Sequence, residues 1–106
     1  MIDETILQQE QEAFLRDTLQ MLLAQDSPTG FTGRAVDLAE GIAREQGFET
    51  RRTNKGNLVI TVPGRESGHK VGLCAHVDTL GAMVRSIKDN GRLRPTTLGG
   101  HQWSTA

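Results

Sequence analysis

A histidine and an aspartate two residues apart, His76 and Asp78, are the pair in this 106-residue sequence best suited to chemistry. They follow the apolar run 71–75, which is typical of a strand buried on both faces of a parallel sheet. Residues two apart on a strand project to the same side, at the sheet edge where α/β proteins bind ligands. The carboxylate can accept a proton from one imidazole nitrogen and leave the other nitrogen for a metal ion. The spacing is compatible with a metal ligand, but by itself it favours a histidine that merely ends a buried strand, with an aspartate in the following turn.

Other residues that could take part in chemistry are weaker candidates. Cys74 shares a side of the expected strand with His76, but a buried thiol fits the apolar run better than a metal ligand. His69 lies in a loop between glycine and lysine without an evident partner, and Asp89 fits a turn. His101 and Trp103 belong to a polar tail. The predicted site therefore rests on His76 and Asp78.

Composition excludes several classes of protein. Twelve Lys and Arg nearly balance thirteen Asp and Glu, so the net charge of −1 gives no sign of nucleic-acid binding. No apolar run is long enough to span a membrane, and the start Met1-Ile2-Asp3-Glu4 lacks the pattern of a signal peptide. The single cysteine cannot form an internal disulfide. The sequence thus predicts a cytoplasmic protein without nucleic-acid or membrane partners.

Two helices are expected in the first half of the chain. Residues 5–25 have the apolar spacing of an amphipathic helix, with Asp3 as a possible N-cap. Ser27-Pro28-Thr29-Gly30 ends it, because proline and glycine favour turns. A second helix is predicted from the N-cap Thr32 to residue 46, with Gly47 at its C-terminal cap. The buried stripe of this helix is expected at Ala35, Val36, Ala39, Ile42 and Ala43.

Two hairpins are expected on either side of the apolar run. Residues 48–53 and 57–62 read as strands joined by a turn at Asn54-Lys55-Gly56. Residues 82–87 and 92–98 flank Lys88-Asp89-Asn90-Gly91, and Asn-Gly between strand-like runs is a strong hairpin signal.

The order of the elements predicts an α/β fold of the three-layer α/β/α kind, of which this chain is a part. A parallel strand at 71–75 would be central, with the helix that contains Ala35 and Ile42 packed on it. Replacing Leu73 with alanine is then expected to cost about 2–5 kcal/mol. Two helices and two hairpins hardly supply the cover that such a strand needs on both faces, so the chain is interpreted as a fragment.

Several motifs resemble those of a known family. Ser27-Pro28-Thr29-Gly30, Asn57-Leu58 and Cys74-Ala75-His76-Val77-Asp78 are similar to successive landmarks of the co-catalytic zinc aminopeptidases. Within that group, Gly81-Ala82-Met83-Val84, Asp89-Asn90-Gly91-Arg92-Leu93 and Leu98-Gly99-Gly100 resemble the glutamyl and deblocking aminopeptidases, also labelled cellulase M or endoglucanase. The resemblance runs from the first helix to Gly100.

The resemblance implies an N-terminal part of a metalloaminopeptidase that acts on peptides and forms homo-oligomers. Residues 1–80 would be the N-terminal part of the catalytic domain, and residues 81–106 the first strands of an inserted, truncated β domain. Each active site would hold two divalent metal ions, zinc or cobalt. His76 matches a metal ligand, and Asp78 matches the catalytic aspartate that hydrogen-bonds and orients it.

The same resemblance implies that the site is incomplete in this chain. The family's bridging aspartate, glutamate pair, second aspartate and last histidine come from later segments, so the fragment alone is expected to be inactive. Two alternatives remain open: a fragment of a related zinc deacylase or amidohydrolase, or a non-catalytic assembly module whose strand edges and apolar faces pair with another chain.

Overall fold

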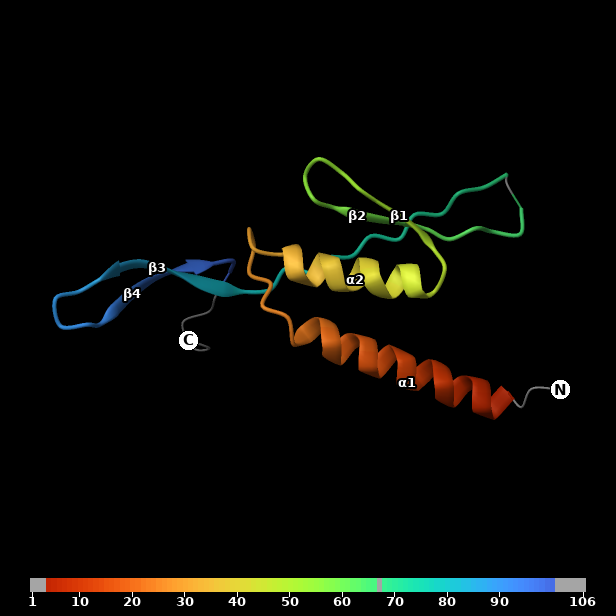
Figure 1. The fold of residues 1–106 in the computed structure, drawn as a ribbon, viewed down its shortest axis with the longest axis horizontal. Coiled ribbons are helices and arrows are strands. Elements are labelled where there is room, and N and C mark those ends of the chain that lie inside the picture. Colours follow the sequence, from red (N-terminus) through yellow and green to blue (C-terminus); the bar gives the residue numbers. More distant parts are fainter. Residues whose placement is uncertain (1–3, 67, 101–106) are drawn as a thin grey trace.

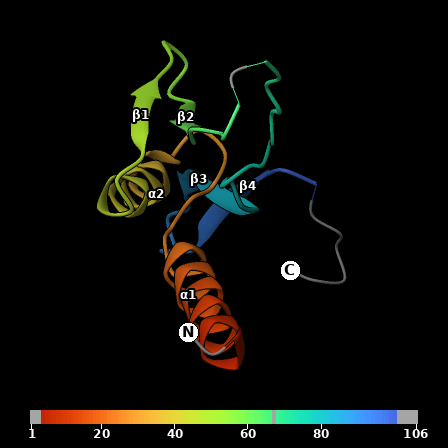
Figure 2. The ribbon, with the colours of Figure 1, turned by 90° about the vertical axis from the view of Figure 1, so that its right-hand side faces the viewer.

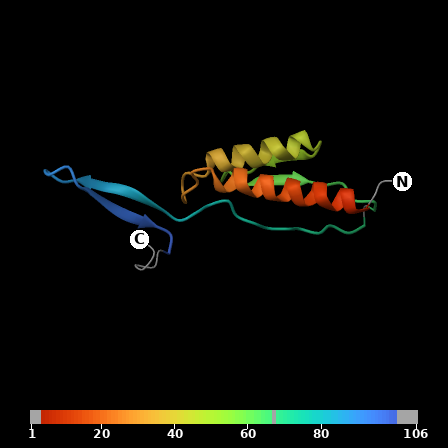
Figure 3. The same cartoon turned by 90° about the horizontal axis from the view of Figure 1, so that it is seen from below.

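The computed structural model describes residues 4–66 and 68–100, and its helices and hairpins follow the expected order. The elements are α1 (Glu4–Leu23), α2 (Gly33–Glu45), β1 (Glu49–Arg52), β2 (Leu58–Thr61), β3 (Gly81–Ile87) and β4 (Leu93–Leu98). Helix α2 lies between α1 and the antiparallel β1–β2 hairpin (Figure 1 and Figure 2). The antiparallel β3–β4 hairpin extends away from these elements (Figure 3), and the molecule measures 68 × 35 × 23 Å.

Helix α2 carries the small core of the described residues. Ala35, Val36 and Ala43 are buried, and the other two members of the predicted stripe are partly buried. At its end Gly47 adopts a φ of 82°, and its N–H donates to the Arg44 carbonyl at 2.9 Å. The next N–H, of Phe48, donates to the Ala43 carbonyl at 3.0 Å, which completes a Schellman motif. The predicted glycine cap is therefore confirmed, whereas Thr32 is the N-cap residue without a capping side-chain hydrogen bond.

Both predicted hairpins form. In the first, two backbone hydrogen bonds of 2.9 Å close the turn. The Thr53 N–H donates to the Asn57 carbonyl, and the Gly56 N–H donates to the Thr53 carbonyl. In the second, only Gly91 has a positive φ, of 78°, and its N–H donates to the Lys88 carbonyl at 2.9 Å. The loop is therefore a three-residue turn ending in a left-handed glycine, and not the two-residue type I′ turn that Asn-Gly favours. Strand β4 contains Pro95 opposite Val84, and the register shifts directly after this pair. Because proline has no N–H to donate, the ladder is irregular beside it.

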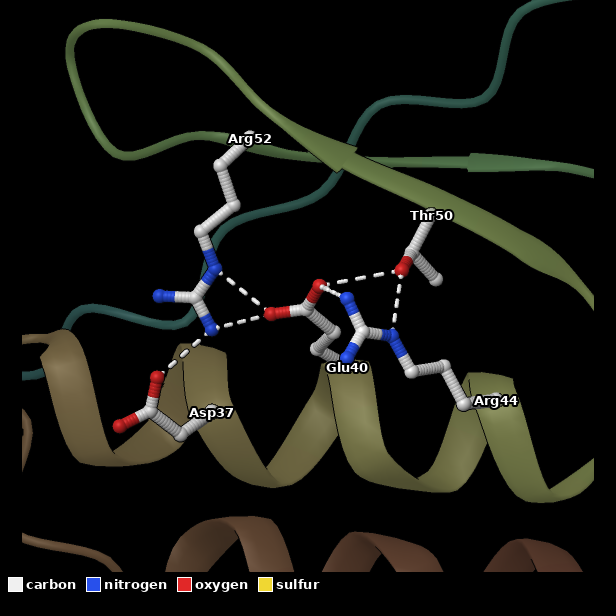
Figure 4. Close-up of polar contacts among 5 residues, drawn as sticks. All are labelled: Asp37, Glu40, Arg44, Thr50 and Arg52. Atoms are coloured by element: carbon white, nitrogen blue, oxygen red, sulfur yellow. Dashed lines mark hydrogen bonds and ion pairs between the residues drawn. The ribbon is translucent and has the colours of Figure 1, made fainter.

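A cluster of charged side chains joins α2 to β1 (Figure 4). Glu40, whose side chain is 13% exposed, accepts bonds of 2.6 Å from both Arg44 and Arg52. Arg52 also pairs with Asp37 at 2.6 Å, and the Thr50 hydroxyl donates to Glu40 at 3.0 Å. The hydrogen bonds from Arg52 and then Thr50 lower the pKa of Glu40. Since Arg52 and Thr50 belong to β1, these bonds hold the hairpin on the helix.

Replacing Glu40 with glutamine is expected to lower the thermal midpoint of the chain at pH 7. The folded-state pKa of Glu40 is depressed, so its contribution is present above the unfolded pKa of about 4.3 and is lost as pH falls through the lower folded value. The difference in thermal midpoint between the wild type and Glu40→Gln should therefore become smaller as the pH falls below about 4.3. Thermal unfolding followed by circular dichroism measures this. Glu45→Gln, on the same helix but outside the cluster, is the matched control, and a pH-independent difference would contradict the prediction.

The prediction of a buried strand at 71–75 is wrong for this chain. These residues form no strand, the side chains of Val71 and Leu73 are 88% and 96% exposed, and the Cys74 thiol is exposed rather than buried. A central strand needs partners at its edges and apolar cover on its faces, whereas α2 packs on β1 and β2. With so exposed a side chain, Leu73→Ala should change the stability of this chain by no more than about 0.5 kcal/mol. The structure supports a mixed α/β chain.

Helix α1 has the predicted extent, but its apolar side chains are largely exposed. No residue of α1 is buried, and seven large apolar side chains of this helix are exposed: Ile6, Leu7, Phe14, Leu15, Leu19, Met21 and Leu23. In the part of the chain that the structure describes, no helix is both long and apolar enough to cross a membrane. Homo-oligomer formation stays a prediction, as does the Asp3 cap, which lies outside the described residues.

Candidate functional site

The turn after α1 lies against the segment that follows the His-x-Asp motif. The Thr79 N–H donates to the Ser27 carbonyl at 2.7 Å, and Pro28 and Thr79 form a parallel bridge. The two backbones approach so closely that a Cβ atom on Gly81 would lie 2.5 Å from Pro28 Cβ. Real Cβ atoms essentially never approach so closely. Position 81 therefore accommodates glycine, whereas any residue with a Cβ atom would force the two segments apart. Segments 27–30 and 78–81, distant in sequence, are thereby fixed side by side.

The side chains of His76 and Asp78 meet at this junction, as the sequence predicts. His76 Nδ1 lies 2.9 Å from Asp78 Oδ1 and 3.2 Å from the Asp78 carbonyl oxygen. With Asp78 ionised, Nδ1–H donates and the lone pair of Nε2 points away from the carboxylate. The His76 side chain is 82% exposed, so a metal ion can reach it. The geometry fits one ligand of a metal site.

A third side chain, Thr29, completes the arrangement. Its hydroxyl donates to Asp78 Oδ2 at 2.8 Å, so each oxygen of the carboxylate has its own partner. The hydrogen bond from Thr29, followed by that from His76, holds the pKa of Asp78 below its ordinary value. The sequence predicts for Thr29 only a place in a turn that belongs to a family landmark. No spacing rule could connect it with a carboxylate 49 positions later.

The weaker candidates do not add to this site. Asp89 lies in the β3–β4 turn as expected, and His69 is exposed in the loop before residue 70. His101 and Trp103 lie outside the described residues. Within residues 4–66 and 68–100, no group of three His, Cys, Asp or Glu residues is placed to hold a metal ion. A complete zinc site uses three or four protein ligands, so His76 would need ligands from elsewhere.

Comparison with known proteins assigns the chain to a family. Residues 56–106, which include His76 and Asp78, match the model of the M42 glutamyl aminopeptidases. The chain is also 40% identical over 94 residues to "Putative aminopeptidase YhfE" of Bacillus subtilis (strain 168). This chain belongs to the M42 glutamyl aminopeptidase family. The match to the Bacillus protein covers 86% of this M42 chain and 27% of that relative.

Two further relatives agree with this assignment. The M42 chain is 30% identical over 87 residues to "Glutamyl aminopeptidase" of Lactococcus lactis subsp. cremoris (strain MG1363), covering 81% of the chain and 24% of that protein. It is 34% identical over 74 residues to "Putative aminopeptidase" of Acetivibrio thermocellus, covering 67% and 22% respectively. The chain spans about a quarter of the length of these curated relatives. The predicted resemblance is confirmed at the level of the family.

Proposed function

We propose that this chain contributes to a metal-dependent aminopeptidase that removes N-terminal residues from peptides, with His76 as a metal ligand and Asp78 as the residue that orients it. The observation that carries the assignment of the site is the 2.9 Å contact between His76 Nδ1 and Asp78 Oδ1 inside the region that matches the M42 family. The names of the relatives support the aminopeptidase activity.

The two side chains have separate tasks in this proposal. The Asp78 carboxylate keeps the imidazole proton on Nδ1 and fixes the plane of the ring, so that Nε2 presents a lone pair. Imidazole nitrogen suits zinc and other first-row transition metals, and the family resemblance favours zinc or cobalt. Two bound ions would polarise the peptide carbonyl and provide a nucleophilic water. Their remaining ligands would come from other segments of the enzyme.

The separation of the elements supports the proposed division into domains. Residues 1–80 would form the N-terminal part of a three-layer catalytic domain, and 81–106 would begin a β domain. In the described residues, β3 and β4 pack on each other and extend away from the α2 and β1–β2 unit (Figure 3). The Pro28–Thr79 bridge lies just before this hairpin, at the proposed boundary.

The test of the activity uses the intact protein that carries this chain and compares two peptide substrates that differ only in acetylation of the N-terminus. An aminopeptidase should release the N-terminal amino acid of the free peptide by hydrolysing its first peptide bond. Activity should disappear with a chelator and return with zinc or cobalt. Release of acetate alone from the acetylated peptide, with every peptide bond intact, would favour a deacylase. No hydrolysis of either substrate with metal restored would favour an assembly module.

A further inference from the structure

We infer that Thr29 is a positioning residue for His76 and acts through Asp78: its hydroxyl holds the carboxylate in the orientation that fixes the imidazole. This inference rests on the proposed role of His76 as a metal ligand. It extends that proposal to a residue 47 positions before the histidine in the sequence, outside the His-x-Asp motif. The region that matches the family model begins only at residue 56.

The carboxylate of Asp78 needs an external constraint. Rotation of a carboxylate about the Cβ–Cγ bond is broad and roughly two-fold, so the side chain alone does not select one orientation. The Asp78 side chain is also 41% exposed, so water competes for its oxygens. In the structure Thr29 Oγ1 lies 2.8 Å from Oδ2 while His76 Nδ1 lies 2.9 Å from Oδ1. Holding both oxygens restricts this rotation.

The position of Thr29 is set independently of its own side chain. The backbone bond from Thr79 to the Ser27 carbonyl, 2.7 Å long, fixes the turn next to Asp78. The close approach of Pro28 to Gly81 adds a second contact between the same segments. Removing only the Thr29 hydroxyl should leave this junction in place. The effect of the hydroxyl can thus be separated from that of the turn.

The consequence concerns the direction of the metal-binding lone pair. An imidazole held only by a mobile carboxylate samples more orientations, so Nε2 is correctly placed for a smaller fraction of the time. Loss of an orienting carboxylate typically lowers metal affinity or activity by roughly 10–100-fold. Thr29 acts one hydrogen bond further from the metal than Asp78. We therefore expect loss of its hydroxyl to weaken metal binding by roughly 3–10-fold, which is less than the effect of losing the carboxylate.

The test measures zinc dissociation constants of the intact protein by competition with a chromophoric chelator, without reference to turnover. Thr29→Val keeps the branched shape without the hydroxyl and should weaken zinc binding. Thr29→Ser restores the hydroxyl and should return the affinity to near the wild-type value. Thr32→Val is the matched control, since the Thr32 hydroxyl makes no capping bond, and it should bind zinc like the wild type.

A double-mutant comparison tests the route through Asp78. In an Asp78→Asn background, Thr29→Val should weaken zinc binding less than it does in the wild type, because the two residues act in one chain of hydrogen bonds. Each of three results would overturn the inference. They are a Thr29→Val variant that binds zinc like the wild type, a Thr29→Ser variant that binds zinc as weakly as Thr29→Val, and effects of Thr29→Val and Asp78→Asn on zinc affinity that add in full. A His76→Ala variant separates the two proposals: if it binds zinc like the wild type, the proposed metal ligand itself is wrong.

Discussion

Replacing His76 with alanine is expected to reduce aminopeptidase activity of the intact protein to the background level. The variant loses the imidazole that the structure holds 2.9 Å from Asp78 with its outer nitrogen accessible. A metal site that has lost a ligand binds its ion weakly and places the reacting water poorly. Asp78→Asn keeps the ligand but removes the charged acceptor, so its activity or metal affinity should fall by roughly 10–100-fold.

Hydrolysis of leucyl- or glutamyl-anilide, together with the metal content of the purified variants, measures both effects. His69→Ala is the matched control because His69 is another exposed histidine of the same chain, seven residues earlier. It should retain the activity and metal content of the wild type. Full activity in His76→Ala would rule out this residue as a metal ligand. A larger loss of activity in Asp78→Asn than in His76→Ala would contradict the proposal that His76 binds the metal and Asp78 only orients it.

The features that the sequence predicts well are those decided by nearby residues. The end of α2 depends on Gly47, which takes the positive φ that most side chains avoid. The β3–β4 turn depends in the same way on Gly91. The meeting of His76 and Asp78 is also local, since they are separated by a single residue. It forms even though 71–75 is not a strand, so the geometry of the pair does not depend on a surrounding sheet.

The features that sequence patterns predict wrongly, or do not predict, depend on residues distant along the chain. The apolar run around Leu73 has the composition of a buried strand, but burial requires neighbours that pack on it. In the described residues Leu73 is 96% exposed. The hydrogen bond between Thr29 and Asp78 is not predictable from the sequence for the related reason that it joins positions 49 apart. Such contacts follow from the path of the whole chain, which a local pattern does not contain.

The number of ligands that the described residues can supply to the proposed metal site bears on what the 106-residue chain does alone. Dinuclear sites hold their ions about 3.5–4 Å apart with ligands that converge from several segments. The described residues supply His76 and its partner Asp78, but no group of three ligands. The further ligands that the proposed dinuclear site needs would have to come from other residues.

The isolated 106-residue chain is therefore expected to hydrolyse no leucyl- or glutamyl-anilide, even with added zinc or cobalt. It should bind zinc weakly, and His76→Ala should remove most of that binding, because a lone imidazole is a poor site. Zinc titration and the anilide assay on the purified chain test the two parts separately, with His69→Ala again as the control. Zinc binding that survives His76→Ala would point to ligands elsewhere in the chain. Sustained turnover that is lost in His76→Ala would show that these 106 residues contain a complete site, and the proposal that other segments supply the remaining ligands would be wrong.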